Sequence, residues 1–113
     1  MAATLLVFSD AVAGREAEYH AWYDATHLPE LLALPGFVAA RRWTRAAEVA
    51  GFPACAQGNV AMYELDGDGE AALAAMMQAA ATGELHMSDA LDQGSLVLWL
   101  FTARGERMVR LGA

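Results

Sequence analysis

The chain has 113 residues, 57% of them hydrophobic and 19% charged, so it can bury one core and we expect a single domain over residues 1–113. The net charge is −7 and the seven basic residues are all arginines without a basic stripe, which argues against nucleic acid and anionic membranes as partners. The apolar content exceeds what one small core can hide, so a subunit interface is expected.

The N-terminal segment indicates no export. It contains a short apolar run but no basic region, no small-residue cleavage site and far fewer than the ~20 apolar residues needed to cross a bilayer. The single cysteine, Cys55, cannot form an internal disulfide and fits a reducing compartment. We therefore expect a cytoplasmic protein.

The first strand and the first helix are predicted from the apolar pattern. Residues 4–9 form a short apolar run that ends at Asp10, as in a strand covered on both faces. From residue 14 to residue 34, apolar and aromatic residues recur every three or four positions, which is the period of a helix.

Pro29 should interrupt this helix. It has no N–H for the carbonyl of Ala25, and it disfavours helical geometry at Leu28. Thr26 could cap a new turn. We therefore expect a break within residues 24–30.

A second strand is expected after Pro35 and Gly36, which end the helix. Residues 37–45 would place Phe37, Ala39, Arg41, Trp43 and Arg45 on one face, and Val38, Ala40, Arg42 and Thr44 on the other. Residues 46–57 show neither period and predict a connecting loop.

The second half repeats the alternation of strand and helix. Residues 59–65 predict a strand, and Asp68 can cap a helix over residues 71–81 that stops near Gly83. The inward face of that helix is expected to carry Leu73, Met76, Met77 and Ala80.

The last segment completes the order βαββαβ. Residues 84–94 are polar and acidic and could form a short helical turn or a loop, whereas residues 95–102 are the most β-prone run of the chain. This order predicts an α+β fold in which both helices cover one face of a four-stranded antiparallel sheet. A second copy packed on the bare face, in a two-fold homodimer, would bury the excess apolar surface.

Three runs between residues 22 and 43 form a recognisable pattern. They are Trp22-Tyr23-Asp24-Ala25-Thr26-His27-Leu28-Pro29-Glu30, Leu34-Pro35-Gly36-Phe37 and Ala40-Arg41-Arg42-Trp43. This pattern resembles the EthD-like family of dimeric α+β barrel proteins. The resemblance implies a ferredoxin-like half-barrel, paired into a closed barrel, with a pocket between sheet and helices and a histidine from the first helix. His27 lies on the matched motif, whereas His20 precedes it.

The resemblance implies less about activity. Most family members are uncharacterised, and the family name comes from a bacterial ether-degradation cluster. Some relatives are dehydratases or decarboxylases of fungal polyketide pathways, and the wider superfamily includes isomerases, cyclases, cofactor-free monooxygenases and haem-binding proteins. A small enzyme of catabolism or secondary metabolism is therefore implied, and we expect it to use no cofactor.

The candidate catalytic residues are His27, Asp24 and Tyr23. On an uninterrupted helix, Asp24 and His27 would share a face with His20, and a carboxylate bonded to one nitrogen would orient the imidazole and make it more basic. The alternatives are a capping or packing role for His27, and a cap or an ion pair with Arg41 or Arg42 for Asp24. For His20 a solvent-facing position is favoured.

The candidate substrate-binding residues are Trp22, Arg41, Trp43 and Tyr63. Trp43, like Tyr23, brings a polar atom to an apolar wall. For Trp22 and Trp99 a place in the core is the favoured alternative. Arg41 and its neighbour in sequence point to opposite faces of the strand, so only one can hold an anionic or enolate oxygen, and the sequence leaves open which.

Three further features carry weaker signals. A metal site of two histidines and one carboxylate is disfavoured, because the helix break spoils its geometry and no fourth ligand is in register. Cys55 has no histidine in sequence reach that would activate it. His86 could belong to a lid over the pocket, although an exposed position is favoured.

The sequence thus predicts a small cofactor-free enzyme that acts on a hydrophobic or aromatic molecule in a pocket between the sheet and the first helix. Lyase, dehydratase or isomerase chemistry follows from a lone acid/base, His27. The first alternative is a non-catalytic binding or accessory protein of a catabolic pathway, for which the same pocket would serve. The second alternative is a cofactor-free monooxygenase acting on a phenol.

Overall fold

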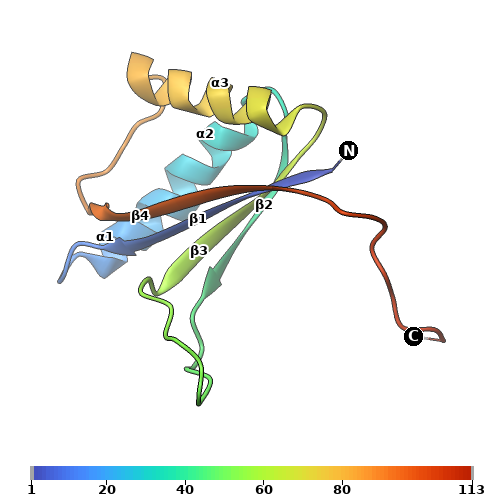
Figure 1. Cartoon of the computed structure of the whole chain (residues 1–113). Coiled ribbons are helices and arrows are strands. Elements are labelled where there is room, and N and C mark those ends of the chain that lie inside the picture. Colours follow the sequence, from blue (N-terminus) through green and yellow to red (C-terminus); the bar gives the residue numbers. More distant parts are fainter. Residues whose placement is uncertain (1, 113) are drawn as a thin grey trace.

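The chain forms one sheet with helices on one side of it (Figure 1). The computed structural model describes residues 2–112. Its elements are β1 (Ala3–Ala11), α1 (Glu16–Trp22), η1 (Tyr23–His27), α2 (Leu28–Leu32), β2 (Phe37–Thr44), β3 (Asn59–Leu65), α3 (Gly69–Thr82) and β4 (Leu91–Thr102). The strands pair antiparallel in the order β2-β3-β1-β4. The predicted ferredoxin-like α+β architecture is confirmed.

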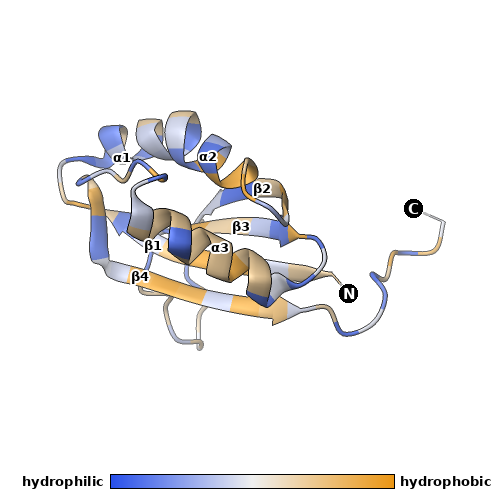
Figure 2. Ribbon diagram, turned by 90° about the horizontal axis from the view of Figure 1, so that it is seen from above, coloured by the Kyte–Doolittle hydropathy of each residue, from blue (hydrophilic) through white to orange (hydrophobic). Residues whose placement is uncertain are grey.

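The helices lie side by side over the sheet. α2 packs against β2, whereas α3 packs against β1 and β4 (Figure 2). The core fills the space between helices and sheet, and its fully buried side chains include Leu5, Tyr19, Leu31 and Tyr63. Within residues 2–112, no helix is long and apolar enough to cross a membrane.

The other face of the sheet is bare and aromatic. Trp99, Phe101 and Trp43 leave 59%, 52% and 45% of their surface exposed there. The favoured core position for Trp99 is therefore wrong for the single chain. Trp99 pairs with Leu6, the β1 residue next to the buried Leu5, and side chains that are neighbours along a strand point to opposite faces.

Pro29 changes the first helix without breaking it. Residues 23–27 form a π-helical turn in which the N–H of Leu28 bonds the carbonyl of Tyr23, five residues back. Backbone angles stay helical through His27 and Leu28, and no side chain caps α2, so Thr26 does not act as a cap. The wider turn carries the chain past the proline ring, which would clash with a carbonyl in a regular α-helix.

The expected faces of β2 are wrong at its start, because the pairing with β3 shifts between Phe37 and Ala39. This β-bulge puts Phe37 on the helix side together with Arg42, while Arg41 and Trp43 lie on the bare side. A bulge adds one residue to one strand, so every later side chain switches face relative to a simple alternation.

β4 begins at Leu91, four residues before the expected start at Ser95. The pairing of β1 with β4 shifts between Phe8 and Asp10, and Asp10 then pairs with Asp92. The Ser95 hydroxyl accepts the Asp10 N–H at 2.8 Å, which satisfies the backbone at this irregular point. Polar residues thus extend the strand, because ladder hydrogen bonds are made by the backbone.

α3 is capped as predicted and is slightly longer than expected. The Asp68 side chain accepts the N–H groups of Glu70 and Ala71, and Gly83 ends the helix in the left-handed conformation. Met76 is buried, but Met77 is 55% exposed and does not point fully inward as expected.

Gly36, in the turn between α2 and β2, should not tolerate a side chain. Its φ is +87°, and a Cβ atom would lie 2.9 Å from Cβ of Ala72 in α3. We expect Gly36→Ala to lower the free energy of unfolding by about 2 kcal/mol, from left-handed strain and overpacking together. Gly83→Ala is the matched control, because Gly83 has a φ of +82° with nothing within 4 Å of the added atom. Equal losses in urea unfolding would contradict the packing contribution.

Candidate functional site

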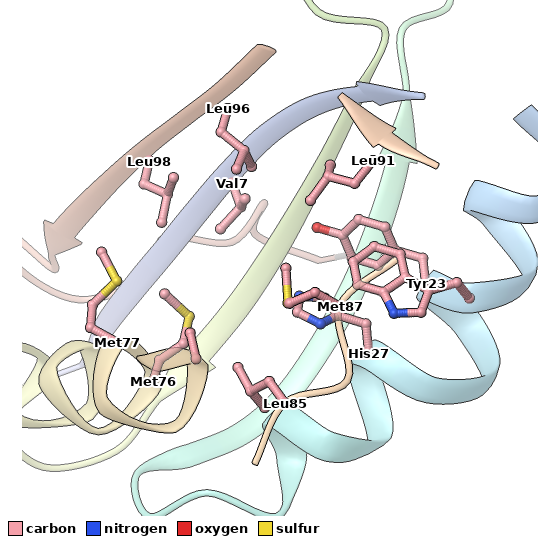
Figure 3. Close-up of a pocket in the computed structure, with 12 residues that line it drawn as sticks. Val7, Tyr23, His27, Met76, Met77, Leu85, Met87, Leu91, Leu96 and Leu98 are labelled. Atoms are coloured by element: carbon pink, nitrogen blue, oxygen red, sulfur yellow. The ribbon is translucent and has the colours of Figure 1, made fainter. Parts of the chain in front are cut away.

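A cavity of about 170 Å³ lies between the first helical segment, α3 and the sheet (Figure 3). Its wall is almost entirely apolar and includes three methionines. The lining residues are Val7, Trp22, Tyr23, His27, Met76, Met77, Ala80, Leu85, Met87, Leu91, Leu96 and Leu98. The ring of His27 reaches from the helix toward Met76 and Met87 (Figure 3). Such a cavity suits a small ligand with few polar groups.

His27 is buried in this wall and has an unpaired nitrogen. The side chain is 8% exposed, and its Nδ1 has no hydrogen-bond partner among residues 2–112. The ring stacks on Trp22 at 4.5 Å between centroids and lies perpendicular to the Tyr23 ring at 5.1 Å. Burial lowers the pKa of His27 to about 4, Glu30 opposes this shift, and the charge of Arg42 adds to it. The imidazole is therefore neutral at pH 7.

Asp24 does not orient His27. Its Oδ1 accepts a hydrogen bond from Arg42 at 2.9 Å, so the structure shows the alternative left open for Asp24, an ion pair with an arginine of β2. Arg42 also lies 2.8 Å from Nδ1 of His20 and 4.3 Å from the centre of the Tyr23 ring. These contacts form a polar cluster on the β2 side of the helix. The π-turn rotates His27 out of line with Asp24, which explains why the expected pair does not form.

Of the candidate substrate-binding residues, Trp22 lines the cavity and the other three do not. Arg41 lies on the bare sheet face with its guanidinium 4.8 Å from the centre of the Trp43 ring, so the bulge in β2 excludes both from this cavity. Tyr63 is fully buried in the core and its hydroxyl is unpaired. Burial raises the pKa of Tyr63; the nearby Tyr23 hydroxyl contributes, although the two do not meet the geometry of a hydrogen bond.

Residues 83–90 form a covering loop over the cavity, and sequence reasoning missed most of it. Leu85 of this loop is buried and Met87 is half-exposed, and both line the cavity. His86 is exposed, as favoured, yet it also holds the covering loop down. Its backbone N–H donates to Glu30 at 2.8 Å, its imidazole bonds the same carboxylate, and its carbonyl accepts the Trp22 indole N–H at 2.7 Å.

Two charged residues of the helical segment hold the covering loop. The hydrogen bonds from His86 lower the pKa of Glu30. Arg15 donates to the side chain of Asp89 at 2.8 Å and to its carbonyl at 3.2 Å. The position of Glu30 in the 22–30 motif was the one signal in the sequence that could have pointed to this contact.

No metal cluster is formed by the described part of the chain: within residues 2–112, three or more histidine, cysteine, aspartate or glutamate side chains do not gather closely enough to hold an ion. His20 and Asp24 meet at Arg42, whereas His27 faces the cavity.

Sheet and helices together define a ferredoxin-like α+β fold, which the chain shares with solved structures of EthD and EthD-like proteins. An EthD (ethyl tert-butyl ether D) family protein from Bacillus halodurans C-125 superposes with a TM-score of 0.63 at 22% identity, over 96% of this chain and 100% of that one. An EthD-like protein from Ralstonia eutropha JMP134 superposes with a TM-score of 0.62 at 20% identity, over 94% of this chain and 95% of that one. A proposed monooxygenase from Shewanella loihica PV-4 superposes with a TM-score of 0.60 at 15% identity, over 93% of this chain and 96% of that one.

Neither a protein-family profile nor a curated protein sequence matches the chain. The identities to the solved structures are low, so these similarities establish the fold alone.

Proposed function

We propose that this protein is a small enzyme that binds an uncharged, mainly apolar molecule beside His27 and transfers a proton with that residue in a lyase, dehydratase or isomerase reaction. The supporting observation is the buried, unpaired Nδ1 of His27 in an otherwise apolar wall. A buried polar atom without a partner costs about 1–3 kcal/mol. A ligand oxygen that bonds the imidazole edge would recover part of that cost.

The low basicity of His27 limits the substrates it can deprotonate. With a pKa of about 4, taking a proton from an acid of pKa ~10 is uphill by about 8 kcal/mol. That fits within the ~17 kcal/mol barrier of a reaction at about 1 per second. An acid of pKa ~20 would need about 22 kcal/mol and is too weak. The proposed substrate is therefore a phenol, or a compound whose C–H bond is acidified by two carbonyl groups.

A second candidate function is cofactor-free oxygenation of a phenol. The specific observation in its favour is that an indole and an imidazole, Trp22 and His27, stack on each other in the cavity wall. The fold is shared with a proposed monooxygenase from Shewanella loihica. Oxygen consumption with a dihydroxyarene would favour this reaction over the first. Ligand binding without turnover of any tested phenol would instead favour an accessory protein.

Binding of 1-naphthol and naphthalene tests the role of His27. The two probes share a ring system, and only 1-naphthol can bond the imidazole. We expect the wild-type protein to prefer 1-naphthol about tenfold, and His27→Leu to lose that preference while still binding naphthalene. NMR titration measures both affinities. If His27→Leu preferred 1-naphthol over naphthalene as strongly as the wild-type protein does, the proposed hydrogen bond would be contradicted. If neither probe bound the wild-type protein, the cavity would not be a ligand site.

We also propose that the chain acts as one domain in a homodimer built on the bare sheet face. The support is the aromatic and aliphatic surface exposed on that face, which includes Trp99, Phe101, Trp43 and Val97. A contiguous apolar surface of this kind marks an interaction site, and a two-fold pair is the commonest way to cover it.

A further inference from the structure

Trp22 makes two contacts that serve different parts of the site. Its ring stacks on His27, with 25° between the ring planes. Its indole N–H donates to the carbonyl of His86 in the covering loop at 2.7 Å. One rigid side chain therefore bridges the imidazole and the covering loop.

The imidazole depends on these packing contacts for its position. A buried histidine is commonly held by a hydrogen bond from one ring nitrogen to a carboxylate or carbonyl, but Nδ1 of His27 has no such partner. The neighbouring rings are Trp22, which is stacked on the imidazole, and Tyr23, which is perpendicular to it. A shift of the indole would therefore release the imidazole on one side.

The covering loop, in turn, is anchored in the core by Leu85 and Ala90 and linked to its surroundings by polar contacts. Its links to the helical segment are the Trp22 indole, Glu30 and Arg15. The contacts of Glu30 and Arg15 also hold the loop, but neither residue lines the cavity. The indole N–H, by contrast, belongs to a side chain that itself lines the cavity.

We propose that Trp22 is a positioning residue that couples closure of the covering loop, residues 83–90, to the placement of His27. When the loop lies over the cavity, the His86 carbonyl holds the indole and the indole holds the imidazole. When the loop opens, the indole loses its anchor and the imidazole is released. The mechanical coupling stands on these contacts; its catalytic meaning rests on the proposed function, in which His27 would transfer protons only in a closed cavity that excludes water.

Two charged groups lie close enough to His27 to affect its pKa. They are Glu30 of α2, which also bonds His86, and Arg42 of β2. α3 and the covering loop face the cavity with methionine, alanine and leucine side chains, and β1 and β4 with valine and leucine. A test should therefore change the indole N–H and leave both charges in place, as Trp22→Phe does.

The experiment compares two rates: hydrogen exchange in residues 83–90, and modification of His27 by diethyl pyrocarbonate. This reagent reacts only with an exposed, neutral imidazole. In Trp22→Phe we expect both rates to rise about fivefold and by the same factor, as after loss of one hydrogen bond. His20 is an internal control, because it contacts Arg42 rather than Trp22. Trp99→Phe, the same replacement on the bare face, should change neither rate.

Two results would overturn the coupling. One is faster exchange in the covering loop with His27 modified at the wild-type rate, and the other is a folded Trp22→Phe protein in which neither rate changes. If the variant fails to fold, the wild-type protein still decides: the opening constants from Trp22 indole exchange and from His27 modification should agree within about threefold, and a tenfold mismatch excludes coupling. No substrate is needed, so failure here leaves the naphthol test of the proposed function unaffected.

Discussion

Replacing His27 by leucine is expected to remove about 3 kcal/mol of the stability loss that the wild-type protein undergoes between pH 7 and pH 4. Burial lowers the pKa of His27 from 6.5 to about 4 in the folded protein. Between these two pKa values His27 is protonated in the unfolded chain and neutral in the folded protein, so acid favours unfolding. The stability from this group is complete above pH 6.5 and is lost as the pH falls to about 4.

Carboxyl groups affect a lower range of pH. Hydrogen bonds lower the pKa of Glu16, Glu30 and Asp89 below their ordinary values of 4.5, 4.5 and 3.8, so stability from these groups is lost only below those values. About 2 of the 3 kcal/mol assigned to His27 falls above pH 5, where these groups stay ionised.

Urea unfolding at pH 7, 6, 5 and 4 and at one protein concentration measures this effect. Met76→Leu is the control, since it changes another buried side chain of the cavity wall that carries no ionisable group, and it should keep the wild-type dependence on pH. At pH 7, His27→Leu should be at least as stable as wild type, because leucine leaves no unpaired nitrogen. A variant with the same pH dependence as wild type would show that His27 is not buried in the neutral form.

The expected result, a smaller loss of stability in acid for His27→Leu, would also indicate why the cavity wall contains an imidazole. A buried histidine that costs stability and makes no hydrogen bond has no structural advantage over leucine in a wall of leucines and methionines. Groups of this kind concentrate at functional sites, where a ligand supplies the missing partner.

Much of the fold could be predicted because burial leaves a periodic pattern in the sequence. The order of elements and the Asp68 cap followed from local rules, whereas a π-helical turn stands where a break of the helix was expected. The bulge after Phe37 did not follow from these rules, because Ala39 and Ala40 are identical and hide the shift in alternation that an inserted residue produces. The start of β4 at Leu91 was missed because a polar stretch can pair through its backbone.

The lining of the cavity was predicted only where local sequence determines it. His27, Tyr23 and Trp22 lie in one short motif, and all three line the cavity. The partner of Asp24 depends on the rotation of the helix by the π-turn, which no spacing rule reveals. The covering loop depends on a carbonyl 64 residues away from Trp22, and a backbone acceptor has no signature in the sequence.

The largest expected effect concerns the bare sheet face. Replacing Trp99 by glutamate should dissociate the proposed homodimer, because it removes an exposed aromatic side chain and places a charge in the interface. A two-fold interface contains the substitution twice, and about 2 kcal/mol or more per copy weakens association about a thousandfold. Light scattering after gel filtration should then give a mass near 12.0 kDa for the variant and about twice that for wild type.

The control is Leu32→Glu, which puts the same charge on an apolar side chain of α2 that is 41% exposed on the helix side. This variant should stay dimeric, since the helix layer lies opposite the proposed interface (Figure 1). Circular dichroism should show the same fold for both variants, because neither side chain lies in the core of the single chain. A wild-type mass of one chain would contradict the proposed homodimer. A dimer that survives Trp99→Glu and is lost in Leu32→Glu would place the interface on the helix side. Either result would leave the aromatic surface to another partner.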